Sequence, residues 1–283
     1  MNLEAIYTIT NSLNQFLKPD SIKESDLNSI KYRIDGLFRL LPLPLYNCIP
    51  ARLERLTINE SIPDLGEKRV DQIEHLRNPP TNSVKKYGRC NTLNHSVLYG
   101  AFNFLTIVNE LTPDVGKLIT HAEWRLKEEA SLRFFPVFFI TQIDDDPHNG
   151  LSLEIKELHE NYISSYTEND KQCFNLSMQF FAECFAKKVD KSNHFDYFLS
   201  AYISKKIFEI ESLNYEGILY PSTGMDLGFS NMALRPEVFR DKFKLIEVRY
   251  ELNSISPGKS GGNHVINRST KFDLEKDLII WEE

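Results

Sequence analysis

The chain has 283 residues, enough for two domains of average size or for one large domain with an appendage. Its 33 Lys and Arg residues stand against 40 Asp and Glu residues, a net charge of −7, which disfavours a broad surface for nucleic acid or anionic membrane. Only 12 glycines disfavour a glycine-built dinucleotide cradle, whereas 19 Phe and 12 Tyr indicate a packed interior.

Cysteine spacing and the length of apolar stretches indicate where in the cell the protein is expected. The four cysteines lie far apart with no CxxC pair, which indicates neither a zinc ribbon nor a disulfide framework. The longest apolar stretches, Leu40–Tyr46 and Phe134–Ile140, contain proline and are far shorter than the ~18 residues of a membrane span. The amphipathic start does not match a secretory signal. We expect a soluble cytoplasmic protein.

Two amphipathic helices are expected at the N-terminus, in a hairpin over residues 2–41. Apolar side chains recur at helical spacing in two stripes, with one polar member: Leu3, Ile6, Thr10, Leu13 and Leu17, then Leu27, Ile30, Ile34, Leu37 and Leu41. Pro19 separates the stripes, and Ser21 with Glu24 has the spacing of a capping box. Prolines then interrupt the chain, so we divide it into residues 1–45, the hairpin, and residues 46–283, the body. We expect the hairpin to dock on its own chain.

The body is predicted to mix strands and helices. Strand patterns cover Leu53–Ile58, Val97–Tyr99, Leu118–Lys127, Phe134–Ile140, Gly217–Tyr220 and Phe243–Tyr250. Helical patterns cover Val70–Leu76 and Phe102–Leu111, with two later stripes, Phe174 to Phe185 and Leu199 to Ile210. Strands early, helices in the middle and strands again predict an α+β fold with a mixed sheet.

Three segments resemble parts of ligand- or metal-binding motifs but lack the rest of the motif or have an ordinary explanation. Gly258-Lys259-Ser260 lacks the earlier glycine of a phosphate-binding loop. His121-Ala122-Glu123 lacks the Pro-Cys-x-x-Cys that completes a zinc deaminase site, which favours an ordinary strand histidine. The acidic run Asp144–Asp146 precedes Pro147, as in a solvated turn. No metal site is expected.

Several polar residues stand at element ends, where each also has an ordinary interpretation. Arg89 precedes a strand, as a surface arginine often does. Glu110 shares a helix face with two other polar residues, which also suits a solvated helix. Ser222 follows Tyr220-Pro221, where turn serines are common. Arg55 lies within a strand, where a partly buried charge needs a partner, and Arg52 is an alternative for its role.

Together these segments resemble the RES family, named for an Arg, a Glu and a Ser. The resemblance runs from about Leu53 to Tyr250 and rests on Leu53-Glu54-Arg55, Gly88-Arg89-Cys90-Asn91, Ser96-Val97-Leu98-Tyr99, Asn109-Glu110, Gly217 to Ser222 and Asn231-Met232-Ala233-Leu234. It implies that the family's site residues are Arg55, Arg89, Tyr99, Glu110 and Ser222. Two residues depart from the family pattern: Cys90 stands where many members have an aromatic residue, and Leu56 stands where an aromatic or small residue is common.

The resemblance implies an ADP-ribosyltransferase-like fold and NAD as substrate. Such proteins are similar to enzymes that cleave the nicotinamide–ribose bond and pass ADP-ribose to phosphate, water or a protein. Glu110 would stabilise the cationic ribose, the two arginines would hold the pyrophosphate, Tyr99 would stack on nicotinamide or ribose, and Ser222 would orient Glu110 or the ribose.

The resemblance also makes a toxin of a toxin–antitoxin pair the expected biological role, with an antitoxin protein as partner. A second copy of the chain is a further candidate partner, as a surface for the apolar stripes of the hairpin. Two alternatives stay open. One is a non-catalytic binding or regulatory protein that keeps the fold. The other is a serine hydrolase that uses Ser222, although no Gly-x-Ser-x-Gly elbow surrounds this residue.

Overall fold

The computed structural model describes residues 1–50, 52–62, 65–66, 68–127, 131–139, 150–190, 192–223, 230–256, 259 and 261–282. The α-helices are α1 (Leu3–Asn14), α2 (Leu27–Phe38), α3 (Phe104–Leu111), α4 (Gly150–Ile163), α5 (Glu168–Ala186), α6 (Phe198–Phe208) and α7 (Pro236–Lys242). The strands are β1 (Tyr46–Cys48), β2 (Leu53–Ile58), β3 (Leu98–Ala101), β4 (Leu118–Leu126), β5 (Leu132–Pro136), β6 (Gly217–Pro221), β7 (Ser230–Leu234), β8 (Phe243–Leu252), β9 (His264–Ser269), β10 (Lys271–Asp273) and β11 (Leu278–Ile280). Two 3-10 turns matter below, η4 (Ile73–Leu76) and η7 (His194–Tyr197).

One large mixed sheet organises the molecule. Nine strands pair in the order β1-β5-β6-β7-β3-β2-β4-β8-β9, and β10 pairs with β11 in a small second sheet. Strands β5 and β6 run parallel, whereas the other described pairs are antiparallel. The predicted α+β class with a mixed sheet is therefore confirmed.

The register of the strands assigns side chains to the two faces of the central sheet. Residues directly opposite each other in paired strands share a face, and faces alternate along each strand. The first face, here called the Tyr220 face, carries Glu54, Tyr99, Ala101, Ile218, Tyr220, Asn231 and Ala233. The second, here called the Arg55 face, carries Leu53, Arg55, Leu98, Ala122, Leu219, Met232 and Leu234.

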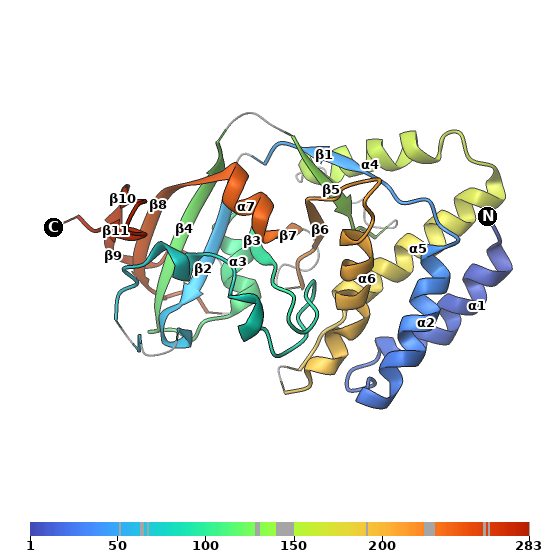
Figure 1. Cartoon of the computed structure of the whole chain (residues 1–283), viewed down its shortest axis with the longest axis horizontal. Coiled ribbons are helices and arrows are strands. Elements are labelled where there is room, and N and C mark those ends of the chain that lie inside the picture. The colour runs from blue at the N-terminus through green and yellow to red at the C-terminus, as the bar shows by residue number, and fades with distance from the viewer. Residues whose placement is uncertain are drawn as a thin grey trace.

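Different elements cover the two faces. On the Tyr220 face, α3 packs over β2, β3 and β7, and α5 packs over β6. On the Arg55 face, η4 and α7 contribute Ile73, Leu76 and Phe239 to an apolar cluster with Leu53, Leu98 and Leu234. Helices α1, α2, α5 and α6 form a bundle at one end of the molecule, and β9 to β11 lie at the other end (Figure 1).

The N-terminal hairpin packs on the body through its apolar stripes. Helix α1 contacts α5, and α2 contacts α6. The stripe residues Ile6, Leu13, Ile30 and Ile34 are fully buried and belong to the same apolar cluster as the cores of α5 and α6. Burial at this scale is a main source of folding free energy. The expected docking of the hairpin on its own chain is confirmed.

The connection between the two hairpin helices differs from its prediction. The Ser21 hydroxyl does not cap α2, because it donates to the Lys18 carbonyl at 2.5 Å and accepts from Lys187 Nζ at 3.3 Å. The turn that leads into α2 is closed instead by the Lys23 amide, which donates to Asp26 Oδ2 at 2.9 Å. The predicted Ser21–Glu24 capping box is therefore wrong, since Ser21 binds the body.

Several predicted elements shift in extent. Strand β2 matches its prediction, but only Ile73–Leu76 of the predicted helix Val70–Leu76 is helical, as a 3-10 turn. Strand β5 is Leu132–Pro136, so it begins two residues before the prediction and ends at the proline, which cannot donate to the ladder. Helix α3 begins at Phe104 because Asn103 caps it. The acidic run Asp144–Asp146 lies outside the described residues.

Cysteine and membrane features can be stated for the described part of the chain. All four cysteines are unpaired, and Cys90, Cys173 and Cys184 are buried. Burial raises the pKa of the Cys90 thiol to about 12. None of the described helices has both the length and the apolar character needed to cross a membrane. Across the same residues, no group of three or more His, Cys, Asp or Glu side chains is arranged to hold a metal ion.

Candidate functional site

Glu110 lies in the last turn of α3, over the Tyr220 face of the sheet. The Asn103 side chain accepts from the Thr106 amide at 2.9 Å, which fixes the start of this helix. Its end is fixed by Thr112, whose φ of 46° lies in the left-handed region that terminates a helix. Thr106 is fully buried and Asn103 and Glu110 are half-buried, so the polar face predicted for this helix is not an ordinary solvated face.

Ser222 meets Glu110 directly, although 112 positions separate them in the sequence. Its hydroxyl donates to Glu110 Oε1 at 2.5 Å, and the serine is fully buried at the end of β6. A hydrogen bond to a carboxylate is stronger than one between neutral groups, so this contact holds the carboxylate in one orientation. The structure thus brings together two of the residues that the sequence singles out.

Tyr220 lies on the same sheet face as Tyr99. The tyrosine is buried, and its ring lies 5.7 Å from the ring of Phe185 in α5. Burial raises its pKa well above the usual range, the nearby Glu110 charge raises it further, and Arg89 opposes this rise. Both charges therefore act on a single protonated phenol on the Tyr220 face, which sequence reasoning did not select.

Arg89 is held against the end of α5. Its Nη1 donates to the carbonyl groups of Phe185 and Lys187, at 3.2 Å for Lys187, and its guanidinium carbon lies 5.3 Å from the centre of the Tyr197 ring. Carbonyl groups at a helix end attract a cation. Within the described part of the chain, Nε and Nη2 of Arg89 have no hydrogen-bond partner and no carboxylate pairs with the group. A half-buried guanidinium of this kind can bind an anion.

Tyr99 anchors the loop that carries Arg89. Its hydroxyl donates to Asn91 Oδ1 at 2.9 Å and accepts from the Cys90 amide at 2.7 Å. Gly88 closes this loop tightly, because a Cβ there would lie 2.2 Å from Asn91 Oδ1. Burial raises the pKa of Tyr99 well above its usual range, so the phenol stays a donor. The Tyr99 hydroxyl thus holds the loop that carries Arg89. This role differs from the expected stacking of Tyr99 on nicotinamide or ribose.

Arg55 lies on the opposite face of the sheet from Glu110. Its Nη1 donates to the Tyr99 carbonyl at 2.8 Å and its Nη2 to the Arg77 carbonyl at 3.0 Å, which ties the segment after η4 to β3. Burial lowers its pKa to about 10. The structure therefore does not bring Arg55 together with Arg89, and a shared grip of these two arginines on one pyrophosphate does not fit the fold. This corrects the expected placement of Arg55 in the site.

Arg52, the alternative to Arg55, precedes β2 and lies on the side of the Tyr220 face. Alternation places it with Glu54, and its Nε lies 3.2 Å from Glu54 Oε1 and 3.3 Å from the Phe102 carbonyl. Phe102 stands just before α3, so Arg52 supports the start of the helix that carries Glu110. The group is half exposed, and its partner Glu54 is buried.

Asn231 is a site residue that sequence reasoning did not select. In β7 it pairs with Tyr220 on one side and with Ala101 on the other, which places it on the Tyr220 face. The residue is buried, and its side-chain Nδ2 has no hydrogen-bond partner in the described structure. An unsatisfied buried donor is costly, which suits a position that a ligand completes. Only the register of three strands reveals this position.

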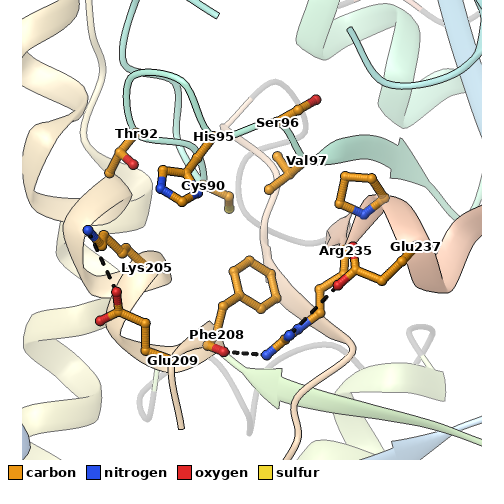
Figure 2. Close-up of a pocket in the computed structure, with 11 residues that line it drawn as sticks. Cys90, Thr92, His95, Ser96, Val97, Lys205, Phe208, Glu209, Arg235 and Glu237 are labelled. Atoms are coloured by element: carbon orange, nitrogen blue, oxygen red, sulfur yellow. Dashed lines mark hydrogen bonds and ion pairs between the residues drawn. The ribbon is translucent and has the colours of Figure 1, made fainter. Parts of the chain in front are cut away.

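A separate cavity of about 250 Å³ opens behind the Cys90–Val97 loop. The Phe208 ring faces it, between the ion pairs Lys205–Glu209 at 3.6 Å and Arg235–Glu237 at 3.8 Å (Figure 2). Neither Glu110 nor Ser222 lines it. Each cation at its rim already has a carboxylate neighbour, unlike Arg89.

Comparisons with known proteins assign no family to this chain. No protein-family model matches it, and no curated protein matches it either. Any functional conclusion therefore rests on the residues of the site.

Proposed function

We propose that this protein consumes NAD, by cleaving the bond between nicotinamide and ribose and passing ADP-ribose to phosphate, water or a protein side chain. The proposal joins the resemblance to the RES family with one geometric observation, the 2.5 Å contact between Ser222 and Glu110. It includes an ADP-ribosyltransferase-like fold for the α+β body. No metal or further cofactor is needed for this chemistry.

The proposed chemistry assigns the transition-state charge to Glu110. When nicotinamide leaves, the ribose becomes cationic and resembles an oxocarbenium ion, which a fixed carboxylate stabilises. Ser222 keeps the Glu110 carboxylate oriented before the reaction, so no reorganisation is required at that moment. Buried Ser222 has a carboxylate and not a histidine as its described side-chain partner, which disfavours the serine hydrolase alternative.

The proposed dinucleotide contacts are Arg89 and Asn231. The two unpartnered donor positions of Arg89, Nε and Nη2, suit the oxygen atoms of a pyrophosphate. The unsatisfied amide of Asn231 suits a ribose hydroxyl or the nicotinamide carbonyl. Tyr99 supports Arg89 through its loop, and Arg55 supports the opposite face of the sheet. In this proposal Arg55 is a framework residue and not a ligand-binding one.

The proposed biological role is that of a cytoplasmic toxin that depletes NAD and is silenced by an antitoxin protein. A second copy of the chain is the other expected partner. The toxin role and the antitoxin follow from the resemblance to the RES family, and both depend on the activity being present.

The test is incubation of the purified full-length protein with NAD, with and without inorganic phosphate. We expect release of nicotinamide, and the ADP-ribosyl product identifies the acceptor by its mass. The Glu110→Gln variant is the negative control for nicotinamide release, the blank of this assay, since it keeps the shape of the side chain but removes its charge. No nicotinamide release above this blank, combined with NAD binding, would support the alternative of a non-catalytic binding protein. Neither release nor binding would refute the proposal.

A further inference from the structure

The segment from Phe185 to Tyr197 lies between the N-terminal hairpin and Arg89. It includes the end of α5, the connection that follows and η7, and we call it the bridging segment; residue 191 within it is not described. One side of the segment binds the connection between α1 and α2, and the other side binds Arg89. The bridging segment therefore connects the N-terminal hairpin to Arg89, two parts of the chain that are distant in sequence.

A buried ion pair joins the bridging segment to the hairpin. Lys187 Nζ lies 2.8 Å from Asp196 Oδ1, and the two side chains are 2% and 0% exposed. The same Nζ donates to the Phe16 carbonyl at 2.8 Å and to the Ser21 hydroxyl. Both charges are thus satisfied partly by groups of the hairpin, which a buried pair requires.

Asp196 completes the connection with backbone contacts. Its Oδ2 accepts from the amide of Asp20 at 2.5 Å, and its Oδ1 accepts from the amide of Ile22 at 3.2 Å. Asp20 has a φ of 53°, a left-handed conformation that is uncommon for residues other than glycine and that aspartate tolerates better than most. The ion pair therefore holds the shape of the hairpin connection as well as its position.

The opposite side of the bridging segment holds the Arg89 loop. The Lys187 carbonyl accepts from Arg89 Nη1, and the Tyr197 ring, next to Asp196 in sequence, lies against the Arg89 guanidinium. The Tyr87 amide also donates to His194 Nδ1 at 3.4 Å. Lys187 thus binds the hairpin with its side chain and Arg89 with its backbone.

We propose that Lys187 and Asp196 are positioning residues, through which the N-terminal hairpin holds Arg89 in place for an anionic ligand. The inference rests on the proposed function only for the identity of that ligand. It makes the hairpin part of the machinery of the site, in contrast to a detachable interaction module.

The first test measures the Arg89 loop without any ligand. In the double variant Lys187→Met/Asp196→Leu, both charges are removed together, so no unpaired charge stays buried. We expect hydrogen exchange at the Cys90 and Asn91 amides of the full-length protein to rise about tenfold or more. The matched control is Lys206→Met, which breaks the 3.1 Å pair with Asp35 between α2 and α6, away from the bridging segment. A rise in both variants would show general loosening of the hairpin and would overturn the proposal.

A milder variant covers the case in which the double variant does not fold. Ser21→Ala removes one hairpin contact of Lys187 and leaves the ion pair in place. We expect exchange at the Cys90 amide to rise about twofold, with exchange in β4 and β8 unchanged. Wild-type exchange at Cys90 in this variant would overturn the proposal.

The second test uses NAD and separates this inference from the proposed function. In the double variant we expect KM for NAD to rise about tenfold while kcat stays within about twofold. In an Arg89→Lys background the same two substitutions should raise KM no further, because residues that act through Arg89 are coupled to it. An equal rise in both backgrounds would refute the coupling. If the wild-type protein does not turn over NAD, the proposed function fails, and the exchange experiment still decides this inference.

Discussion

The two arginines that the sequence singles out, Arg55 and Arg89, lie in contrasting surroundings. Both donate to backbone carbonyl groups, and neither has a carboxylate partner in the described part of the chain. Arg55, however, lies among the apolar groups of one sheet face, where burial lowers its pKa to about 10. Arg89 lies on the other side of the sheet, against the end of α5, which packs over β6.

The different contacts of the two arginines indicate that Arg55 supports the fold, whereas Arg89 is available to a ligand. The two contacts of Arg55 join the segment after η4 to β3 and use both of its Nη atoms, which leaves only a buried Nε without a partner in the described structure. The described contacts of Arg89 use Nη1 alone. A guanidinium whose other donors stay available can serve a ligand. The predictions below test this division, from the largest expected effect to the smallest.

Glu110→Gln is expected to have the largest effect on turnover. The glutamine keeps the shape of the side chain but removes the charge that stabilises the cationic ribose. NAD turnover should fall by about a hundredfold or more, roughly 3 kcal/mol in the activation barrier. Nicotinamide release measures this loss, and circular dichroism checks that folding is intact. Turnover at the wild-type level would remove Glu110 from the site.

Arg55→Lys should reduce stability and leave NAD affinity unchanged. A lysine cannot reach both the Tyr99 and the Arg77 carbonyl, and hydrogen bonds from a charged group contribute about 1.5–3 kcal/mol each, so we expect a loss of about 2 kcal/mol in the free energy of unfolding. Urea denaturation measures this change. A KM for NAD that rises with no change in stability would return Arg55 to the site.

The sequence predicts the strand of Arg55 but not its face relative to the site. Apolar alternation over Leu53–Ile58 predicts β2 correctly, and it places Arg55 with Leu53. Which face meets Glu110 depends on the register of β2 with β3 and β4, which no local pattern contains. The family resemblance places Arg55 in the site, and only the paired strands show that it lies on the sheet face opposite Glu110.

Other elements escape sequence reasoning because their local signals are weak. Strands β1, β10 and β11 have three residues each, too few for alternation to be visible. Asn231 in β7 gains its meaning from its neighbours Tyr220 and Ala101, which are distant in sequence. By contrast, the long stripes of α1 and α2 predicted both helices, since several turns repeat the same apolar face.

Arg89→Lys is expected to have the opposite effects to Arg55→Lys, a larger change in KM for NAD and a smaller change in stability. The substitution keeps the charge but loses the planar fork that matches phosphate oxygens, so KM for NAD should rise about tenfold, roughly 1.4 kcal/mol. The stability loss should be smaller than that of Arg55→Lys, because a lysine ammonium can still approach the carbonyl groups at the helix end. Steady-state kinetics and urea denaturation of the two variants give a matched pair. Normal KM in Arg89→Lys would make Arg89 a second framework arginine.

The smallest effect concerns His121, a buried histidine on the Tyr220 face that lies between two carboxylates and whose Nδ1 has no hydrogen-bond partner in the described structure. Its Nε2 contacts Glu54, and its Nδ1 lies 3.7 Å from Glu251 Oε1, with all three side chains at most 2% exposed. Burial lowers the pKa of His121, but hydrogen bonds and charges from Glu251 and Glu54 raise it more, so the net shift is upward. Arg52 and Arg249 neighbour these carboxylates.

The sign of the pH dependence follows from that upward shift. A raised pKa in the folded state means that protonated His121 stabilises the fold fully below about pH 6.5, the ordinary pKa of histidine. This contribution is lost as the pH rises through the folded-state pKa. The free energy of unfolding of the wild-type protein should therefore fall over this range more steeply than that of His121→Gln, which carries no titrating group at this position. Urea denaturation at a series of pH values measures both slopes. Equal slopes would mean that His121 titrates with the same pKa in the folded and the unfolded state, and stability that rises with pH relative to His121→Gln would mean that His121 stays neutral between its two carboxylates.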